Sequence, residues 1–289
     1  MAATDLRSTL GAVPIVRDVV VVHGPEAVEF LQGQLSQDVA GLAVGASAPS
    51  LLLQPTGKVD ALLRVTRLGD DEVLLDVDAG WGDAVLARLR RFKLRTKADL
   101  DPATWHGVAL RGPGAEQAHG VGTHRLMAGW PGVEAVDVLG PDGGKSDVPD
   151  AEACALEALR IESGVPVLGA EITDATIPAE LGQWVIDASV SFTKGCYTGQ
   201  ERVARIDSRG GKVPRPVRGL LLDGRVPAVG AAVLLDGAEV GAVTSSAASE
   251  VLGPVALAVI GRGVEVGAAV QVAADGEPIS ATVAELPLR

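Results

Sequence analysis

Apolar residues recur along the first half of the chain with the periods of both strands and helices. Val19–Val22 is a short continuous apolar run, which predicts a buried strand. After Gly24 and Pro25, apolar residues recur every four positions to about Ala40, and this predicts a helix lying on a core. The same reasoning predicts strands at 50–54, 59–67, 73–77, 106–111 and 134–139, and helices at 82–94 and, capped by Asp150, at 151–162.

The pattern changes after Pro216. Over residues 217–287, short runs of Val, Leu and Ala are separated by Gly, Pro and Asp, without a helical period. Short strands separated in this way are typical of a small all-β barrel or sandwich. Residues 140–150 are rich in turn-forming residues and are expected to be a connector. The chain is therefore predicted to be an antiparallel α+β protein that ends in an all-β unit.

Composition narrows the class of protein. The 289 residues are 47% hydrophobic, which is enough for two or three compact units, and only 3% aromatic, so the core must consist of Val, Leu and Ala. The N-terminus lacks a basic segment followed by a long apolar one, and no apolar stretch approaches the ~20 residues that span a bilayer. Cys154 and Cys196 are too few for a disulfide framework and lack a metal-ligand spacing. A reducing cytoplasm is the expected location, and no metal site is expected.

The net charge of the chain disfavours binding to polyanionic partners. The net charge of −12 argues against nonspecific binding to nucleic acid or to anionic membranes. Two basic runs stand out against this background. Arg202, Arg205 and Arg209 fall on one stripe of a predicted helix, which is either a solvated face or a cradle for an anion. The run at 88–97 lies on the outer face of the helix at 82–94, where a solvated face is favoured over a docking surface for an acidic partner.

The segment Lys194–Glu201 (KGCYTGQE) carries the most specific chemistry. Thr198 and Glu201 have the spacing of a capping box, which predicts a helix that begins near Thr198. Cys196 would then lie just before that helix, where unpaired backbone N–H groups and the helix dipole favour a thiolate. The plainer interpretation is a small, half-buried residue in a tight turn. The residues alone leave these two interpretations about equal.

KGCYTGQE resembles the signature of the YgfZ family of folate-binding proteins, which act in making or maintaining iron–sulfur enzymes. Other segments resemble the family in the same chain order. They are FLQGQLSQDV (30–39), LLLQPTGKVDALLRV (51–65), RRFKLRTKADL (90–100) and LRIESGVPVLGAEITDATIPAEL (159–181). The resemblance covers most of residues 15–215.

The resemblance implies an α+β fold of three domains, as in aminomethyltransferases of the glycine cleavage system. Two interleaved antiparallel α+β domains and a C-terminal β-barrel would surround a central opening that holds folate. The first domain is expected at 1–48 together with 150–212, the second at 49–149, and the barrel at 213–289.

The resemblance also implies a set of functional residues. Cys196 would be a reactive or transiently metal- or sulfur-contacting thiol, and Lys194 would support its thiolate. Glu162 would hold the pterin ring, because a carboxylate can accept hydrogen bonds from the amino group and the adjacent N–H. Without the resemblance, Arg160 and Glu162 would simply close the end of an exposed helix. The remaining cofactor-binding candidates are Arg160, Tyr197, Gln200, Glu201, Arg202 and Arg205.

The implied cofactor is tetrahydrofolate or a one-carbon derivative. The implied partners are iron–sulfur client or assembly proteins, with neither nucleic acid nor membrane.

One segment departs from the aminomethyltransferase pattern. These enzymes carry two successive aspartates where this chain has Asp60 and Ala61, so the second carboxylate is absent. A shift of one position on a strand reverses the face, and general acid–base chemistry needs a placed carboxylate. Asp60 is expected to be structural or to contact Lys58. A folate-dependent one-carbon transferase and a non-catalytic docking scaffold, using the basic surfaces at 88–97 or 202–218, remain the alternatives.

Overall fold

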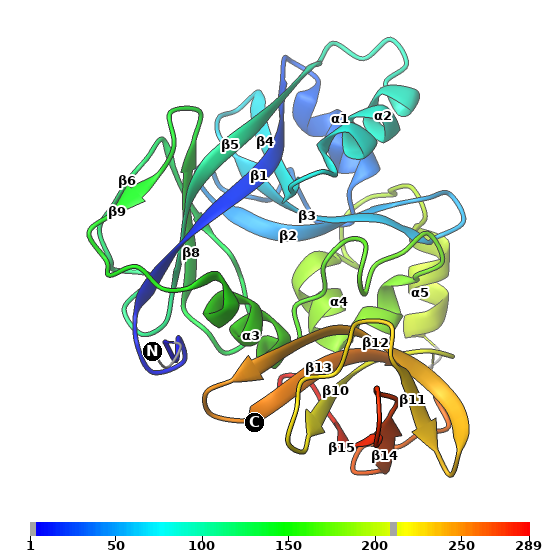
Figure 1. The fold of residues 1–289 in the computed structure, drawn as a ribbon. Helices are drawn as coiled ribbons and strands as arrows, with labels where there is room; N and C mark the ends of the chain where they lie inside the picture. Colours follow the sequence, from blue (N-terminus) through cyan, green and yellow to red (C-terminus); the bar gives the residue numbers. More distant parts are fainter. Residues whose placement is uncertain (1–3, 209–212) are drawn as a thin grey trace.

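The computed structural model describes residues 4–208 and 213–289 (Figure 1). Its largest element is a seven-stranded antiparallel sheet made of β1 (Gly11–His23), β2 (Ser47–Leu53), β3 (Val59–Arg67), β4 (Glu72–Asp78), β5 (Asp99–Arg111), β7 (His124–Met127) and β8 (Ala135–Gly140). The strands are hydrogen-bonded in the order β2-β3-β4-β1-β5-β8-β7. A separate ribbon pairs β6 (Gly120–Val121) with β9 (Lys145–Ser146). The predicted strands of this region are confirmed, and the fold is α+β.

The centre of the sheet is the long pair β1 and β5. The two strands are in register along their whole length, from Gly11 opposite Arg111 to His23 opposite Asp99. The predicted strand at Val19–Val22 is therefore the middle of a longer one. Because β1 also pairs with β4, one continuous sheet crosses the predicted domain boundary between residues 48 and 49. The division into two interleaved domains stays a prediction.

Five α-helices and a 3₁₀ turn accompany the sheet. They are α1 (Ala27–Gln34), α2 (Gly82–Phe92), α3 (Ala153–Ser163), η1 (Pro178–Leu181), α4 (Gln183–Ser189) and α5 (Gln200–Asp207), all within the described ranges. The predicted extension of the first helix to about Ala40 is wrong. Leu35 has an extended backbone and forms a bridge with Leu52 of β2. Leu35 and Val39 are both fully buried, but both lie beyond the helix, and Val39 is in a turn.

Two predicted helix caps are also wrong. The helix predicted to begin near Thr198 begins at Gln200, but its N-cap is Gly199, in the left-handed region with φ 83°, and not Thr198. The Gln200 side chain accepts a hydrogen bond from the Tyr197 N–H at 3.2 Å, which replaces the expected capping box. Helix α3 is preceded by Glu152, which makes no side-chain cap, while Asp150 forms a bridge with Ala12 of β1.

Gly199 brings the start of α5 against the turn between β2 and β3. A Cβ atom at Gly199 would lie 2.6 Å from the Gln54 carbonyl oxygen, and one at Gly57 would lie 2.5 Å from the Arg202 Cβ. The Thr198 N–H donates to the Gly33 carbonyl of α1 at 3.1 Å. The glycines of this segment therefore permit backbone to pack closely against backbone.

The C-terminal part is a closed barrel, as predicted. Its strands are β10 (Val217–Leu222), β11 (Ala232–Leu235), β12 (Ala238–Ser249), β13 (Gly253–Ile260), β14 (Ala269–Val272) and β15 (Ile279–Ala284). They close in the order β10-β13-β12-β11-β14-β15 around a core of small aliphatic side chains. Closure leaves the six strands without a free edge.

Helix α3 joins the barrel to the rest of the molecule (Figure 1). It packs against β12 and β13. The C-terminal segment reaches back to it, because the buried Leu288 donates its N–H to the Glu162 carbonyl at 2.7 Å. Arg7 then bonds both the Leu288 carbonyl, at 2.8 Å, and the Glu162 carboxylate. Among the described residues, no helix has both the length and the apolar character needed to cross a membrane.

Substitution of Gly199 tests this packing. We expect Gly199→Ala to lower the free energy of unfolding by about 2 kcal/mol or more, since the new Cβ meets the Gln54 carbonyl and the backbone is left-handed. Gly195→Ala is the matched control, because nothing lies within 4 Å of its Cβ position. It should stay within about 0.5 kcal/mol of wild type in urea unfolding. Equal stabilities of the two variants would contradict the packing described.

Candidate functional site

A ladder of alternating charges is buried on one face of the sheet. Arg17 of β1 contacts Asp76 of β4 at 3.0 Å, and Asp76 accepts two hydrogen bonds from Arg64 of β3 at 2.8 and 2.9 Å. Arg64 continues to Asp137 of β8 at 2.8 Å, and Asp137 lies 2.8 Å from Arg111 of β5. Strands β3 and β8 are not neighbours in the sheet. The sheet therefore curls so that the ladder bridges across its inside.

The charges of the ladder are not equally well compensated along its length. Burial alone would raise the pKa of Asp137, but the guanidinium groups of Arg111, Arg64 and Arg17 outweigh burial and lower it to about 2. At Arg111 the balance is opposite, since burial lowers its pKa more than Asp137 raises it. Arg111 Nε is fully buried and has no hydrogen-bond partner among the described residues. The Arg111 end is therefore the least compensated part of the ladder.

A cavity of about 300 Å³, here called the central cavity, has the ladder as one of its walls. Arg17, Arg64, Arg111 and Asp137 all line it. Trp130 and Trp184 line it as well, and the Arg111 guanidinium carbon lies 4.4 Å from the centre of the Trp130 ring. Helix α3 and residues 165–167 supply about half of the remaining lining, and residues of the sheet supply most of the other half. This combination of aromatic faces and buried charges suits a planar, polar ring.

Helix α3 turns Glu157 and Arg160, rather than Glu162, towards the central cavity. Residues 153, 156, 157 and 160 line the cavity and form one stripe of the helix. Arg160 holds the Glu157 carboxylate through two hydrogen bonds of 2.6 and 2.8 Å, and the Glu157 side chain keeps 44% of its exposure. Glu162 is two residues further on, about 200° around the helix. It does not line the cavity, and its carboxylate pairs with Arg7.

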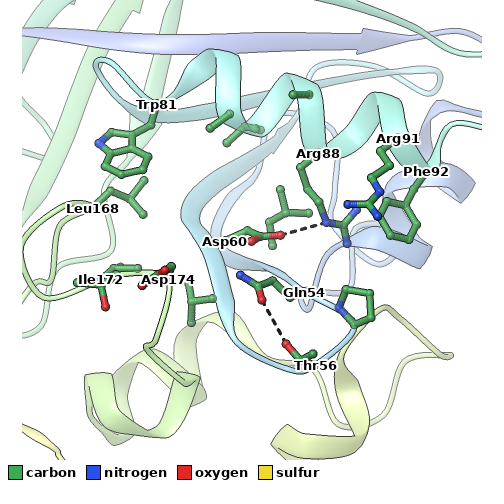
Figure 2. A pocket seen from close by; sticks show the side chains of 17 residues that line it. Gln54, Thr56, Asp60, Trp81, Arg88, Arg91, Phe92, Leu168, Ile172 and Asp174 are labelled. Atoms are coloured by element: carbon green, nitrogen blue, oxygen red, sulfur yellow. Dashed lines mark hydrogen bonds and ion pairs between the residues drawn. The ribbon is translucent and has the colours of Figure 1, made fainter.

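A larger cavity of about 670 Å³, here called the outer cavity, lies between α2, the β2–β3 turn and residues 168–174 (Figure 2). Figure 2 shows Trp81 above Leu168 at one end, with Arg88 directed at Asp60 across the cavity. Arg88 Nε bonds Asp60 at 3.1 Å, and Arg88 Nη2 bonds the Leu53 carbonyl at 2.8 Å. The expected contact of Asp60 with Lys58 is therefore corrected to Arg88. The expected solvated face at 88–97 is wrong for Arg88, which points inwards.

Residues close in sequence line the two cavities. Val167 lines the central cavity and Leu168 the outer one. Likewise, Asp60 lines the outer cavity and Leu62 lines the central one. Residues two apart on a strand are separated by about 7 Å.

The segment 194–201 lies outside the lining of both cavities. Lys194 Nζ donates to the backbone carbonyls of Gln32, Leu35 and Gln37, each at 2.7 Å, at the carboxyl end of α1. These bonds use all three protons of the ammonium group and fasten the segment to α1. Burial lowers the pKa of Lys194 to about 8. The predicted support of a Cys196 thiolate by Lys194 stays a prediction.

Cys196 and its neighbours differ sharply in exposure. Cys196 is exposed and accessible from solvent. Tyr197 is buried in the main hydrophobic core, where burial raises its pKa to about 12, and its ring centre lies 5.2 Å from Lys194 Nζ. A partner molecule can therefore reach the thiol directly, whereas the tyrosine is held in the core.

The remaining predicted cofactor residues lie on α5. Arg202 donates to the Thr56 carbonyl at 3.3 Å, in the turn that lines the outer cavity. Arg202, Arg205 and Glu201 are exposed, while Arg209 of the predicted basic stripe lies outside the described residues. Of the predicted cofactor residues, only Arg160 lines the central cavity. The roles assigned to the others stay predictions.

The sequence analysis missed the cavity residues Arg17, Arg64, Arg111, Asp137 and Glu157. A signal was present in the strands. Arg64 and Asp137 stand alone within runs of Val and Leu, and a charge at such a position must be paired when the strand is buried. Within the described ranges, no group of three or more His, Cys, Asp or Glu residues is placed to hold a metal ion.

Comparison with known proteins places this geometry in context. Residues 215–288 match the family described as "Glycine cleavage T-protein C-terminal barrel domain". The chain is 28% identical to the tRNA-modifying protein YgfZ of Edwardsiella ictaluri, over 65% of this chain and 64% of that protein. It is 28% identical to the aminomethyltransferase of Thermus thermophilus, over 92% of this chain and 83% of the enzyme.

A solved structure shows the same fold. The aminomethyltransferase of the glycine cleavage system from Bartonella henselae superimposes with a TM-score of 0.77 at 23% identity, covering 98% of this chain and 87% of that one. The chain is thus similar to YgfZ proteins in sequence and to aminomethyltransferases in both sequence and fold. The family resemblance and the aminomethyltransferase-like arrangement are confirmed.

Acid should weaken the fold through the ladder. The pKa of Asp137 is about 2 in the folded chain and 3.8 ordinarily, so the unfolded chain takes up the proton first as the pH falls. The resulting stabilisation is complete above about pH 5 and is lost towards pH 2, and it amounts to roughly 2 kcal/mol. Urea unfolding across this range measures it. Asp101→Asn, which changes an exposed carboxyl, should keep the wild-type acid loss, whereas Asp137→Asn should be less stable at neutral pH with a flatter loss. An unchanged slope in Asp137→Asn would refute the assignment.

Proposed function

We propose that this chain binds tetrahydrofolate and supports the assembly or repair of iron–sulfur enzymes in the cytoplasm. The observation that carries the folate part is the central cavity, in which two tryptophans and a buried guanidinium surround a space of about 300 Å³. Small-ligand cavities begin at roughly this size. The space suits a pterin ring but not a whole folate.

The outer cavity supplies room for the remainder of the ligand. Its walls include Trp81, Leu168 and Phe92, which suit an aromatic ring, and Arg91 at its rim is exposed. A folate with its pterin in the central cavity would extend along β3 into this space (Figure 2). The aminobenzoyl group would then lie among apolar side chains, and the glutamate tail would approach the rim.

Glu157 takes the place of Glu162 as the carboxylate that meets the pterin. Its half-exposed oxygens line the central cavity, and Arg160 fixes their direction. A carboxylate held in this way keeps acceptor capacity for an amino group of the ring. Glu162 instead ties Arg7 and, through its backbone, Leu288 to helix α3.

The iron–sulfur part rests on Cys196 and on the YgfZ relatives. The thiol is exposed, so a partner protein can reach it. One cysteine does not hold a cluster, because clusters generally take four protein ligands, and a partner must supply the others. The relative from Edwardsiella ictaluri is named a tRNA-modifying protein. With a net charge of −12, this chain would serve such a process through an enzyme rather than by binding tRNA itself.

A one-carbon transferase is the second candidate, favoured by the aminomethyltransferase relatives. It requires an unengaged carboxylate near the folate nitrogens. Asp60 is paired with Arg88, and Ala61 occupies the position of the second aspartate. This pairing weighs against the transferase. A scaffold that docks through the basic surface at 88–97 would lack Arg88, which is turned into the outer cavity.

Titration calorimetry with tetrahydrofolate under anaerobic, reducing conditions tests the folate site. Wild type should bind saturably, and Glu157→Gln should raise Kd by roughly tenfold or more because a charged acceptor is lost. Glu162→Gln, the matched control, should lower Tm while leaving Kd near the wild-type value. If Glu162→Gln raised Kd and Glu157→Gln did not, Glu162 would be the residue that holds the ring. No saturable binding by folded wild type would overturn the folate proposal.

Replacement of Cys196 separates the candidate functions. Because the thiol is exposed and outside both cavities, Cys196→Ser should keep wild-type stability and tetrahydrofolate affinity. In cells that lack the native protein, it should fail to restore the activity of iron–sulfur enzymes, with Cys154→Ser as the control that restores it. Full restoration by Cys196→Ser would refute the role of the thiol. Aminomethyl transfer by the purified protein would favour the transferase.

A further inference from the structure

A fully buried carboxylate joins the C-terminal barrel to the wall of the central cavity. It belongs to Glu171, whose side chain is fully buried. Its Oε1 accepts a hydrogen bond from the Ser245 hydroxyl of β12 at 2.6 Å. Its Oε2 accepts from the Val167 N–H at 3.1 Å and from Arg160 Nη1 at 3.4 Å. One carboxylate therefore contacts the barrel, the segment 165–167 and helix α3.

A β-bulge in β12 turns Ser245 towards this carboxylate. The pairing of β12 with β13 shifts between Val243 and Ser245, so Thr244 is an extra residue on its strand. Val243 belongs to the barrel core, and two residues further on a regular strand would return to the same face. The bulge instead directs Ser245 out of the barrel to Glu171. Bulges of this kind are common next to functional sites, where they re-aim a side chain.

The barrel is attached to the rest of the molecule without this contact. Val217, Val255 and Leu257 of its strands are buried in the main hydrophobic core, together with residues of the sheet and the helices. A buried ion pair is often no more stabilising than hydrophobic residues that fill the same space. Hydrogen bonds to a carboxylate have a defined direction, however. The contact of Glu171 with the barrel therefore orients the cavity wall rather than simply holding the barrel in place.

A path of hydrogen bonds continues from this carboxylate into the central cavity. Arg160, which bonds Glu171, also holds the Glu157 carboxylate through hydrogen bonds of 2.6 and 2.8 Å. Glu157, Arg160 and residues 165–167 line the cavity, whereas Glu171 and Ser245 lie behind its lining. The path therefore leads from Ser245 of the barrel to Glu157 in the cavity.

We infer that Ser245 and Glu171 are positioning residues, through which the barrel sets the direction of the Glu157 carboxylate and thereby the ligand affinity of the central cavity. This inference rests on the proposed folate binding and adds a role for the barrel in it. Loss of the Ser245 hydroxyl removes one of the donors that hold the Glu171 carboxylate. The carboxylate then draws more strongly on Arg160, which holds Glu157 less firmly.

Two alanine variants of one strand provide the test. Ser245→Ala removes the link to Glu171. Ser249→Ala is the matched control, because it removes a similarly buried hydroxyl of β12 that accepts from the Val251 and Leu252 N–H groups. In anaerobic calorimetry with tetrahydrofolate, Ser245→Ala should raise Kd roughly tenfold, and Ser249→Ala should stay within about twofold of wild type. Equal Kd values for the two variants would overturn the inference and leave the proposed function standing.

A double-mutant cycle separates positioning from a general loosening of the fold. Ser245→Ala is measured in the wild-type and in the Glu157→Gln background. If Ser245 acts through Glu157, its effect on Kd should fall to about twofold or less once that carboxylate is gone. An equal effect in both backgrounds would refute the path. No saturable binding by the folded wild type would overturn both the inference and the proposed function.

A second variant keeps the test available if Ser245→Ala does not fold. Ser245→Cys keeps the volume of the side chain but replaces the hydroxyl with a weaker donor. It should raise Kd by about threefold, again only while Glu157 is present. A wild-type Kd in Ser245→Cys would then refute the inference.

Discussion

The buried ladder of Arg17, Asp76, Arg64, Asp137 and Arg111 is the interaction on which the rest of the structure depends. It connects β3 with β8 across the inside of the curled sheet, where no backbone ladder joins them. Removal of one member of a buried ion pair costs roughly 3–5 kcal/mol because the partner charge is left uncompensated. Hydrophobic packing would hold the same strands together without this cost. The ladder therefore fixes a particular curl, and the curl produces the central cavity.

The same ladder places both paired and incompletely paired charges in the wall of the central cavity. Its middle is satisfied, with Asp76 receiving hydrogen bonds from both Arg17 and Arg64. Its end at Arg111 is not, since burial there outweighs the attraction of Asp137. Local rules of polar satisfaction are commonly broken at functional sites and compensated elsewhere. Here the unpaired Arg111 Nε belongs to the same chain of charges that fixes the curl, so the stability of the sheet and the wall of the central cavity depend on shared residues.

Sequence patterns predicted those parts of the fold that local forces determine. The hairpin strands β2 to β4, helix α2 and the barrel follow from periodicity and turn residues. Long-range contacts determine the other features, such as where α1 ends and how α3 is rotated. Helix α1 ends at Gln34 because Leu35 pairs with Leu52, and the rotation of α3 is set where Arg7 and Leu288 hold Glu162. The choice between Glu157 and Glu162 depends on that rotation, which no local pattern encodes.

The turn between β2 and β3 lies between the outer cavity and the segment 194–201. Gln54 and Thr56 line the outer cavity on one side of this turn. On its other side, Gly199 packs against the Gln54 carbonyl and Arg202 bonds the Thr56 carbonyl. Cys196 lies three residues before Gly199, in a segment that Lys194 fastens to α1. The position of the exposed thiol is therefore set by the same backbone that shapes the outer cavity, although no side chain of the motif enters it.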